Sequence, residues 1–347
     1  MDNMNTLFTA IHNFLLVSLP KERKCSENTV RSYKKTLELF LDFVKKETGK
    51  PFVTLSFEDI DRNTLSAFLE YLETERGCSV STRNQRLNCI RAFYKYASQE
   101  NISVVCYLHE IEKVKKAKEQ KKLVEHMSEN AIQAIISQPD ITTDNGKRDA
   151  FMMLFLYRTG IRVQELVDIK LADIRLGSHP SLTVCGKGNK VRSIPLREDT
   201  VQHLKHYLER FHYEKSMYSN DYLFYTLRNG TRKRMSEDNV RCIVRKYGIS
   251  AKKECLEVPD NVHPHLFRHS LAMALYRNGV DLSLVSQWLG HSCVETTLIY
   301  AHADTEMKRQ AIEKAVPEES ELKQFLNTER YTINDEELLK QLCGLKQ

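Results

Sequence analysis

A run of lysines near the middle of the chain constrains the fold more than any other feature. Residues 113–122 read KVKKAKEQKK, with six lysines and one glutamate. Side chains with this density of charge cannot be buried in a hydrophobic core, so the run must lie at the surface, as a solvated linker or against a polyanion. A chain of 347 residues is long enough for two domains. We therefore predict a helical domain over residues 1–106, a basic linker over 107–127, a second domain over 128–317 and a C-terminal tail over 318–347.

The first predicted domain shows the hydrophobic period of amphipathic helices. Leu37, Phe40 and Val44 recur on one face of a helix that Ser26 can cap. The same period predicts four helices, at about 5–18, 27–48, 59–76 and 80–98. The second and fourth of these carry basic side chains on their polar faces, namely Arg31, Lys35, Arg83 and Arg86. Such faces suit phosphate binding, but they are equally typical of a solvated helix surface.

The second predicted domain mixes two periods. Residues 181–185 and 190–195 read as strands, and the glycine-rich turn between them predicts a β-hairpin. The remaining pattern predicts helices at about 129–138, 148–157, 199–213, 236–247, 266–278, 281–289 and 294–301. The predicted fold class is therefore mainly α with a small β-hairpin or sheet, in which a helical domain precedes a mixed α/β domain.

Composition excludes several classes of protein. Hydrophobic residues make up 41% and charged residues 28% of the chain, which excludes collagen, low-complexity and disordered sequences. No apolar stretch approaches the ~20 residues of a membrane span, and the N-terminus lacks the order of a signal peptide. The nine cysteines are scattered without a C-x-x-C pair, as expected of reduced thiols. We expect a cytoplasmic protein without membrane contact, whose 52 basic against 46 acidic residues permit a polyanionic partner.

Four short motifs in the second domain carry candidate chemistry. They are T-G-x-R-x-x-E-L, which contains Arg162 and Glu165, then G-K-G around Lys187, H-x-x-R-H over 265–269, and L-G-H at 289–291 with Tyr300 nine residues later. An arginine at a helix start and a lysine on a flexible turn both suit a phosphate. Taken singly, each motif fits an ordinary structural role at least as well: an ion pair, a surface turn, a helix start or a packing tyrosine.

Together and in this order, the motifs resemble the tyrosine site-specific recombinases, also called the phage integrase family. The likeness is greatest to simple two-domain members of the Xer-like or transposon type, and it covers nearly the whole chain. The resemblance implies a helical core-binding (SAM-like) domain, a basic linker and a catalytic domain. It also implies a site-specific recombinase that cuts and rejoins DNA and exchanges strands between two recognition sites, in integration, excision or dimer resolution.

The resemblance further implies roles for the motif residues. Tyr300 would attack the scissile phosphate, form a 3′-phosphotyrosine and release a 5′-hydroxyl. Arg162 and Arg268 would hold the non-bridging oxygens.

The remaining residues of the predicted site would move protons or orient these groups. His265 would assist proton transfer from Tyr300, and Lys187 would protonate the departing 5′-oxygen. His291 would contact the phosphate or position the nucleophile. Glu165 would orient the site from behind.

The expected partners follow from the same resemblance. Double-stranded DNA would be bound by the basic helices and the linker, through Arg31, Lys35, Arg83, Arg86, Lys115, Lys116 and Lys118. A homotetramer would assemble on two paired sites, with the protomers linked by apolar residues of the tail: Leu322, Phe325, Leu326, Leu338, Leu339 and Leu342. We expect no metal and no cofactor.

Three alternatives stay open at this point. A strand-passing topoisomerase of the type IB kind would use the same chemistry without exchanging strands. A catalytically silent DNA-binding protein would retain the fold alone. A metallohydrolase would use His263, His265 and His269, but this stretch lacks a suitably spaced carboxylate.

Overall fold

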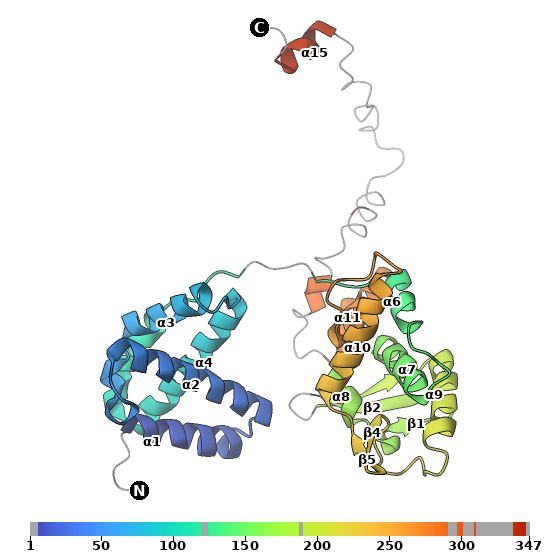
Figure 1. The fold of residues 1–347 in the computed structure, drawn as a ribbon, viewed down its shortest axis with the longest axis horizontal. Coiled ribbons are helices and arrows are strands. Elements are labelled where there is room, and N and C mark those ends of the chain that lie inside the picture. Colours follow the sequence, from blue (N-terminus) through green and yellow to red (C-terminus); the bar gives the residue numbers. More distant parts are fainter. Residues whose placement is uncertain are drawn as a thin grey trace. The chain divides into compact units, whose positions relative to one another are not determined.

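The computed structural model describes residues 6–119, 124–186, 190–290, 297–300, 309 and 336–344 (Figure 1). The chain divides into two compact units, Met1–Lys121 and Lys122–Gln347. The finer predicted boundaries, at 106, 127 and 317, stay predictions.

The described part of the first unit consists of helices. They are α1 (Thr6–Asn13), the π-helical η1 (Phe14–Glu22), α2 (Glu27–Thr48), the short η2 (Phe52–Thr54) and η3 (Phe57–Asp59), α3 (Arg62–Thr74), α4 (Val80–Glu100), η4 (Ile102–Val104) and α5 (Val105–Lys113).

Local signals set the ends of these helices. Ser26 caps α2 by accepting a hydrogen bond from the Thr29 amide, and Gly49 ends the same helix with a left-handed φ of 67°. Asp61 and Ser79 cap α3 and α4 in the same way. The apolar faces meet in an aromatic core in which Phe14, Phe40, Phe68 and Phe93 are almost fully buried.

The first unit differs from the sequence prediction at both ends. The predicted helix 5–18 is α-helical only to Asn13 and continues as a π-helix that includes Pro20. At the other end, part of the predicted linker forms α5, which packs on α4 through the buried Ile111. The lysine run therefore begins inside the first unit.

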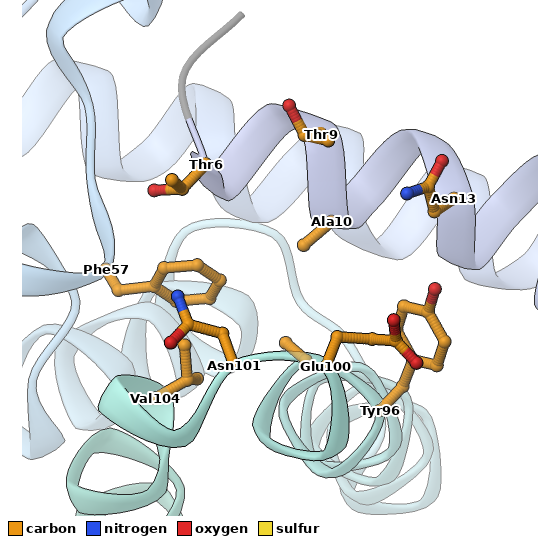
Figure 2. Close-up of a pocket in the computed structure, with 10 residues that line it drawn as sticks. Thr6, Thr9, Ala10, Asn13, Phe57, Tyr96, Glu100, Asn101 and Val104 are labelled. Atoms are coloured by element: carbon orange, nitrogen blue, oxygen red, sulfur yellow. The ribbon is translucent and has the colours of Figure 1, made fainter.

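A small pocket of about 190 Å³ lies between α1 and the C-terminal end of α4 (Figure 2). Ala10 faces Phe57 and Val104 across it, and Tyr96 and Glu100 line its far side. These side chains belong to the packing between α1, η3 and α4, and we assign the pocket no ligand.

The second unit combines helices with two small antiparallel sheets. Its elements are α6 (Glu129–Ile136), α7 (Asp144–Thr159), α8 (Val163–Asp168), η5 (Leu171–Asp173), β1 (Ile174–Arg175), β2 (Ser181–Cys185), β3 (Val191–Pro195), α9 (Glu198–Phe211), β4 (Tyr225–Arg228), β5 (Thr231–Arg234), α10 (Glu237–Lys252), α11 (Pro264–Arg277), α12 (Leu282–Leu289) and α15 (Glu336–Leu342). Residues 297–300 form one further helical turn.

The predicted hairpin is present as β2–β3, in a three-stranded antiparallel sheet with the order β1-β2-β3. Ser181 pairs with Pro195 and Cys185 with Val191. The prediction lacks a second hairpin, β4–β5, which turns at Asn229-Gly230. Both turn residues have positive φ, 50° and 73°, as an Asn-Gly hairpin turn requires.

Helix α7 lies at the centre of the second unit and packs against α9 and α11 (Figure 1). Phe151, Phe155 and Phe224 form the aromatic part of its core. The predicted fold class, mainly α with a small antiparallel sheet, is confirmed. Within the part of the chain that the structure describes, no helix is long and apolar enough to cross a membrane.

Candidate active site

The buried carboxylate of Glu165 in α8 lies at the centre of the site. Its side chain is 2% exposed and accepts four hydrogen bonds: from the Arg162 amide (2.8 Å), Arg162 Nη1 (3.0 Å), and Nη1 and Nη2 of Arg192 (2.8 Å each). Burial raises the pKa of Glu165, but the hydrogen bonds and charges of Arg192 and Arg162 outweigh it and hold the pKa below its usual value. Glu165 is therefore an anion that fixes two guanidinium groups.

Three guanidinium groups also bind the end of α12. Each donates to one of its last carbonyl oxygens: Arg192 Nε to Trp288 (3.0 Å), Arg268 Nη2 to Leu289 (2.6 Å) and Arg162 Nη2 to Gly290 (3.2 Å). These carbonyls have no partner within the helix and carry its partial negative charge. The arginines thereby hold Leu289 and Gly290 beside the T-G-x-R motif.

Gly290 in that motif has two physical reasons to be a glycine. Its φ of +63° is left-handed, and a Cβ atom there would lie 2.9 Å from Cδ and Nη1 of Arg192. A side chain would displace the guanidinium group that binds Glu165.

Arg268 extends this network into the core. It is 3% exposed, and its Nη1 donates to the Gly160 carbonyl at 2.7 Å. Burial, followed by repulsion from Arg162, lowers the pKa of Arg268 to about 9, which leaves it a cation at neutral pH. Two cationic arginines therefore stand close together, an arrangement that suits a phosphate.

Tyr300 lies within reach of these charges and is closed to solvent. It is 0% exposed and packs with Ala272, Met273, Val285 and Leu289. Burial raises the pKa of Tyr300 to about 12, although the charges of Arg268 and Arg162 act in the opposite direction.

The hydroxyl of Tyr300 forms a 2.8 Å hydrogen bond with Nδ1 of His269. Burial, followed by the proximity of His265, lowers the pKa of His269 to about 4. His269 is therefore neutral at pH 7, and its Nδ1 can share a hydrogen bond with the phenol. It belongs to the H-x-x-R-H motif, in which the sequence suggests it only as a metal ligand of the metallohydrolase alternative.

His265, one turn before His269 on α11, is more exposed, and the two rings lie 6.4 Å apart. Its partial removal from water and the charge of Arg268 lower the pKa of His265. Within the described residues, no group of three His, Cys, Asp or Glu side chains could hold a metal ion.

Two predicted site residues, Lys187 and His291, lie outside the described residues. The base of the Lys187 hairpin is described: the Gly186 amide donates to the Lys190 carbonyl at 2.8 Å. A Cβ atom on Gly186 would lie 3.1 Å from Glu165 Oε1, so the residue that precedes Lys187 lies beside the buried carboxylate. His291 follows Gly290, whose carbonyl Arg162 binds.

The predicted DNA-binding residues differ in how accessible they are. Arg31 and Lys35 on α2 are exposed, as are Lys115, Lys116 and Lys118. Arg86 on α4 is half-buried, and the Arg83 side chain is only 14% exposed, because it pairs with Glu73 at 2.9 Å.

The sequence suggests no role for Arg192, and none for His269 beside Tyr300. Arg192 lies five residues after Lys187 and His269 one residue after Arg268, but neither stretch shows where its side chain points. Arg192 could have been considered because it lies on β3, a strand of the hairpin that carries Lys187.

Comparisons with known proteins agree with this geometry. A sequence profile described as Phage integrase family matches residues 125–307, and one described as Phage integrase, N-terminal SAM-like domain matches residues 18–104.

Similar chains include the Sinorhizobium fredii protein named integrase/recombinase y4rC, 32% identical over 314 residues, which cover 90% of this chain and 92% of that protein. Tyrosine recombinase XerD of Staphylococcus epidermidis is 30% identical over 308 residues, which cover 88% of this chain and 97% of that protein. Among solved structures, the XerH site-specific recombinase bound to palindromic difH substrate has a TM-score of 0.67 at 22% identity, with 90% of this chain and 89% of that chain covered. This last likeness establishes the fold.

The chain therefore belongs to the phage integrase family. As a tyrosine recombinase, it cleaves and rejoins DNA in site-specific recombination, and the predicted activity is confirmed. The named relatives are recombinases and integrases. These names do not favour a strand-passing topoisomerase or a catalytically silent DNA-binding protein.

Proposed function

We propose that Tyr300 is the nucleophile of this recombinase and that Arg162 and Arg268 bind the scissile phosphate. The observation that carries the proposal is the Glu165 network, which holds Arg162 in place. The charges of Arg268 and Arg162 both act to lower the pKa of the Tyr300 hydroxyl. Two guanidinium groups would neutralise the charge that develops on the non-bridging oxygens. The two arginines supply the positive charge that a divalent cation would otherwise provide. No nucleotide is needed, because the phosphotyrosine conserves the energy of the broken bond.

The proton of Tyr300 must leave as its oxygen bonds to phosphorus. His269 is placed for this transfer, because its Nδ1 lies 2.8 Å from the hydroxyl. Its lowered pKa makes it a weak base, so the transfer also needs the charges of Arg268 and Arg162, which stabilise the phenolate. His265, the next ring along α11, would assist. Lys187 would protonate the departing 5′-oxygen, and His291 would contact the phosphate.

Attack also requires a change of structure. A phenol that is 0% exposed cannot contact a duplex. We infer that DNA binding separates the 297–300 turn from part of its packing and brings the hydroxyl and the phosphate together.

The role of Lys187 can be tested by changing the leaving group. Replacing the bridging 5′-oxygen by sulfur makes a leaving group that needs no proton. We expect Lys187→Ala to lose cleavage of the ordinary substrate, about 10²-fold or more, and to recover it on the sulfur substrate. Lys190→Ala, at the base of the same hairpin, is the matched control and should lose little on either. Rescue of Lys190→Ala instead would reverse the assignment.

DNA is bound, in this proposal, by Arg31 and Lys35 on α2, by Arg83 and Arg86 on α4, and by Lys115, Lys116 and Lys118. The hydrogen bond from Gln85 Nε2 to Ser32 Oγ at 3.4 Å brings α2 and α4 together near these residues. A cytoplasmic location suits the described cysteines, which are free thiols.

Strand exchange between two duplexes needs four cuts, and one chain carries one Tyr300. We propose a homotetramer whose protomers are linked by the tail 318–347. Within α15, Leu339 and Leu342 are 46% and 66% exposed, which leaves apolar surface for another chain. The tail residues Leu322, Phe325 and Leu326 lie outside the described residues.

Truncation after Pro317 should separate binding from assembly. We expect single-site DNA binding to change less than about twofold, while the four-protomer complex and recombination are lost, because isolated short helices cannot bury their apolar faces. Light scattering of the truncated protein with its DNA would measure the assembly. A normal tetramer would show that the tail folds back on its own chain.

A further inference from the structure

The buried side chain of Asn84 on α4 binds the lysine run as a peptide group would. Asn84 is 5% exposed. Its Nδ2 donates to the Ala117 carbonyl at 2.9 Å, and its Oδ1 accepts from the Ala117 amide at 3.0 Å. Nδ2 also donates to Oε1 of Glu119 at 2.9 Å. One side chain thus satisfies both backbone groups of Ala117.

A second contact lies two turns further along α4. Nη2 of Arg91 donates to the carbonyls of Glu112 (2.9 Å) and Val114. Seven residues of helix rise about 10.5 Å, and the three steps from Val114 to Ala117 span about 10 Å when extended. Asn84 and Arg91 therefore share one face of α4 at a spacing that matches the bound segment.

This attachment determines which side chains of the run point outward. Val114 is 6% exposed and Ala117 is half-buried, whereas Lys115, Lys116 and Lys118 are exposed. Arg83 lies beside the attachment, since its Nη1 donates to Asn84 Oδ1 at 3.2 Å. Arg83 of α4 therefore lies close to the attached segment, with the acids Glu73 and Glu119 as neighbours of this attachment.

We propose that Asn84 is a positioning residue for DNA binding, which fixes the register of residues 114–119 of the lysine run on α4 before DNA arrives. The proposal rests on the proposed contact between the run and DNA. A free run would have to lose conformational entropy when binding orders its backbone. A run that is already ordered avoids that cost, so its lysines contribute more to affinity.

The test uses the full-length protein and a random-sequence duplex, with affinity measured over a range of salt concentrations. Asn84→Ala should weaken binding about tenfold, less than the full entropy cost of the run. Asn88→Ala, an exposed asparagine on the same helix, should leave binding unchanged. In free protein, Asn84→Ala should also speed hydrogen exchange of the Ala117 amide, which reports the attachment directly.

The decisive comparison is with a chain that lacks Lys115, Lys116 and Lys118. Their replacement by Ala should weaken binding and lower the slope of log affinity against log salt by up to about 2.7. In that background Asn84→Ala should have no further effect. An equal tenfold loss in both backgrounds, or none in either, would overturn the role of Asn84.

Two further results have separate meanings. An unchanged salt slope in the lysine variant would show that the run does not contact DNA, which overturns the proposed contact itself. If Asn84→Ala fails to fold, Ala117→Pro removes the same amide donor without changing α4. It should weaken binding in the lysine-containing chain alone, and a normal affinity would count against the proposal.

Discussion

Tyr300→Phe is expected to abolish the covalent protein–DNA adduct while DNA binding changes less than about twofold. The substitution removes one oxygen, the only atom that can form the phosphotyrosine. The ring fills the same space among Met273, Val285 and Leu289, so folding should lose only the hydrogen bond to His269, about 1 kcal/mol. The measurement is a denaturing gel of the protein with nicked genomic duplex fragments, on which the released strand diffuses away and the adduct is trapped. Excess EDTA is included, because the proposed mechanism uses no metal.

Tyr94→Phe is the matched control for this experiment. Tyr94 is also 0% exposed, and its hydroxyl has no hydrogen-bond partner within the described residues. The variant should form the adduct as the unmodified chain does. An adduct that persists in Tyr300→Phe would remove Tyr300 from its proposed role, and loss of the adduct in EDTA alone would contradict the metal-free mechanism.

The second large effect is expected for Arg192→Met, which leaves Glu165 buried with half of its hydrogen bonds. We expect the free energy of unfolding of the second unit to fall by about 3–5 kcal/mol at neutral pH, as when one partner of a buried ion pair is removed. Cleavage should fall as well, because Glu165 and the Trp288 carbonyl lose the group that fixes them beside Arg162. Trp288 is the single tryptophan of the chain, so its fluorescence in urea reports this unit.

The loss should depend on pH in a defined direction. In the unmodified chain the pKa of Glu165 is below its usual value, so its contribution is present above about pH 4.3, the unfolded value, and is lost as the pH falls through the lower folded pKa. Without Arg192, burial is less opposed and raises the pKa of Glu165, so the folded variant takes up a proton more readily. The difference in stability should therefore shrink as the pH is lowered from 7 towards 5.

Two variants separate this effect from a general loss of charge. Arg192→Lys keeps the cation but not the two parallel hydrogen bonds. Its free energy of unfolding should therefore lie between those of Arg192→Met and the unmodified chain. Arg241→Met removes an arginine that pairs with Glu237 and Asp238 at 48% exposure, and it should cost less than about 0.5 kcal/mol. Equal losses for Arg192→Met and Arg241→Met would contradict the importance of the Glu165 network.

Features that depend on neighbouring residues could be predicted from the sequence. The predicted helix 27–48 matches α2, because Ser26 caps its start and Gly49 ends it. The β2–β3 hairpin follows from alternating residues around a glycine-rich turn. The β4–β5 hairpin was missed, although it has an Asn-Gly turn, because its strands carry few apolar residues and show no clear alternation.

The candidate site required more than local pattern. The family resemblance implies that Arg162, Glu165 and Arg268 act together, and the structure joins Arg162 to Glu165 and binds Arg268 to the same end of α12. Nothing in the spacing shows that Arg192 reaches Glu165, 27 residues earlier, or that His269 bonds Tyr300, 31 residues later.

The difference has a physical reason. Helix and strand periods, caps and turns arise from interactions over a few residues, so the chain carries them in its local sequence. Burial of Glu165, the lowered pKa of His269 and the attachment of the lysine run to Asn84 arise where distant elements pack. These properties depend on which side chains shield which others from water. That shielding exists only once α4, α8, α11 and α12 are packed within their units.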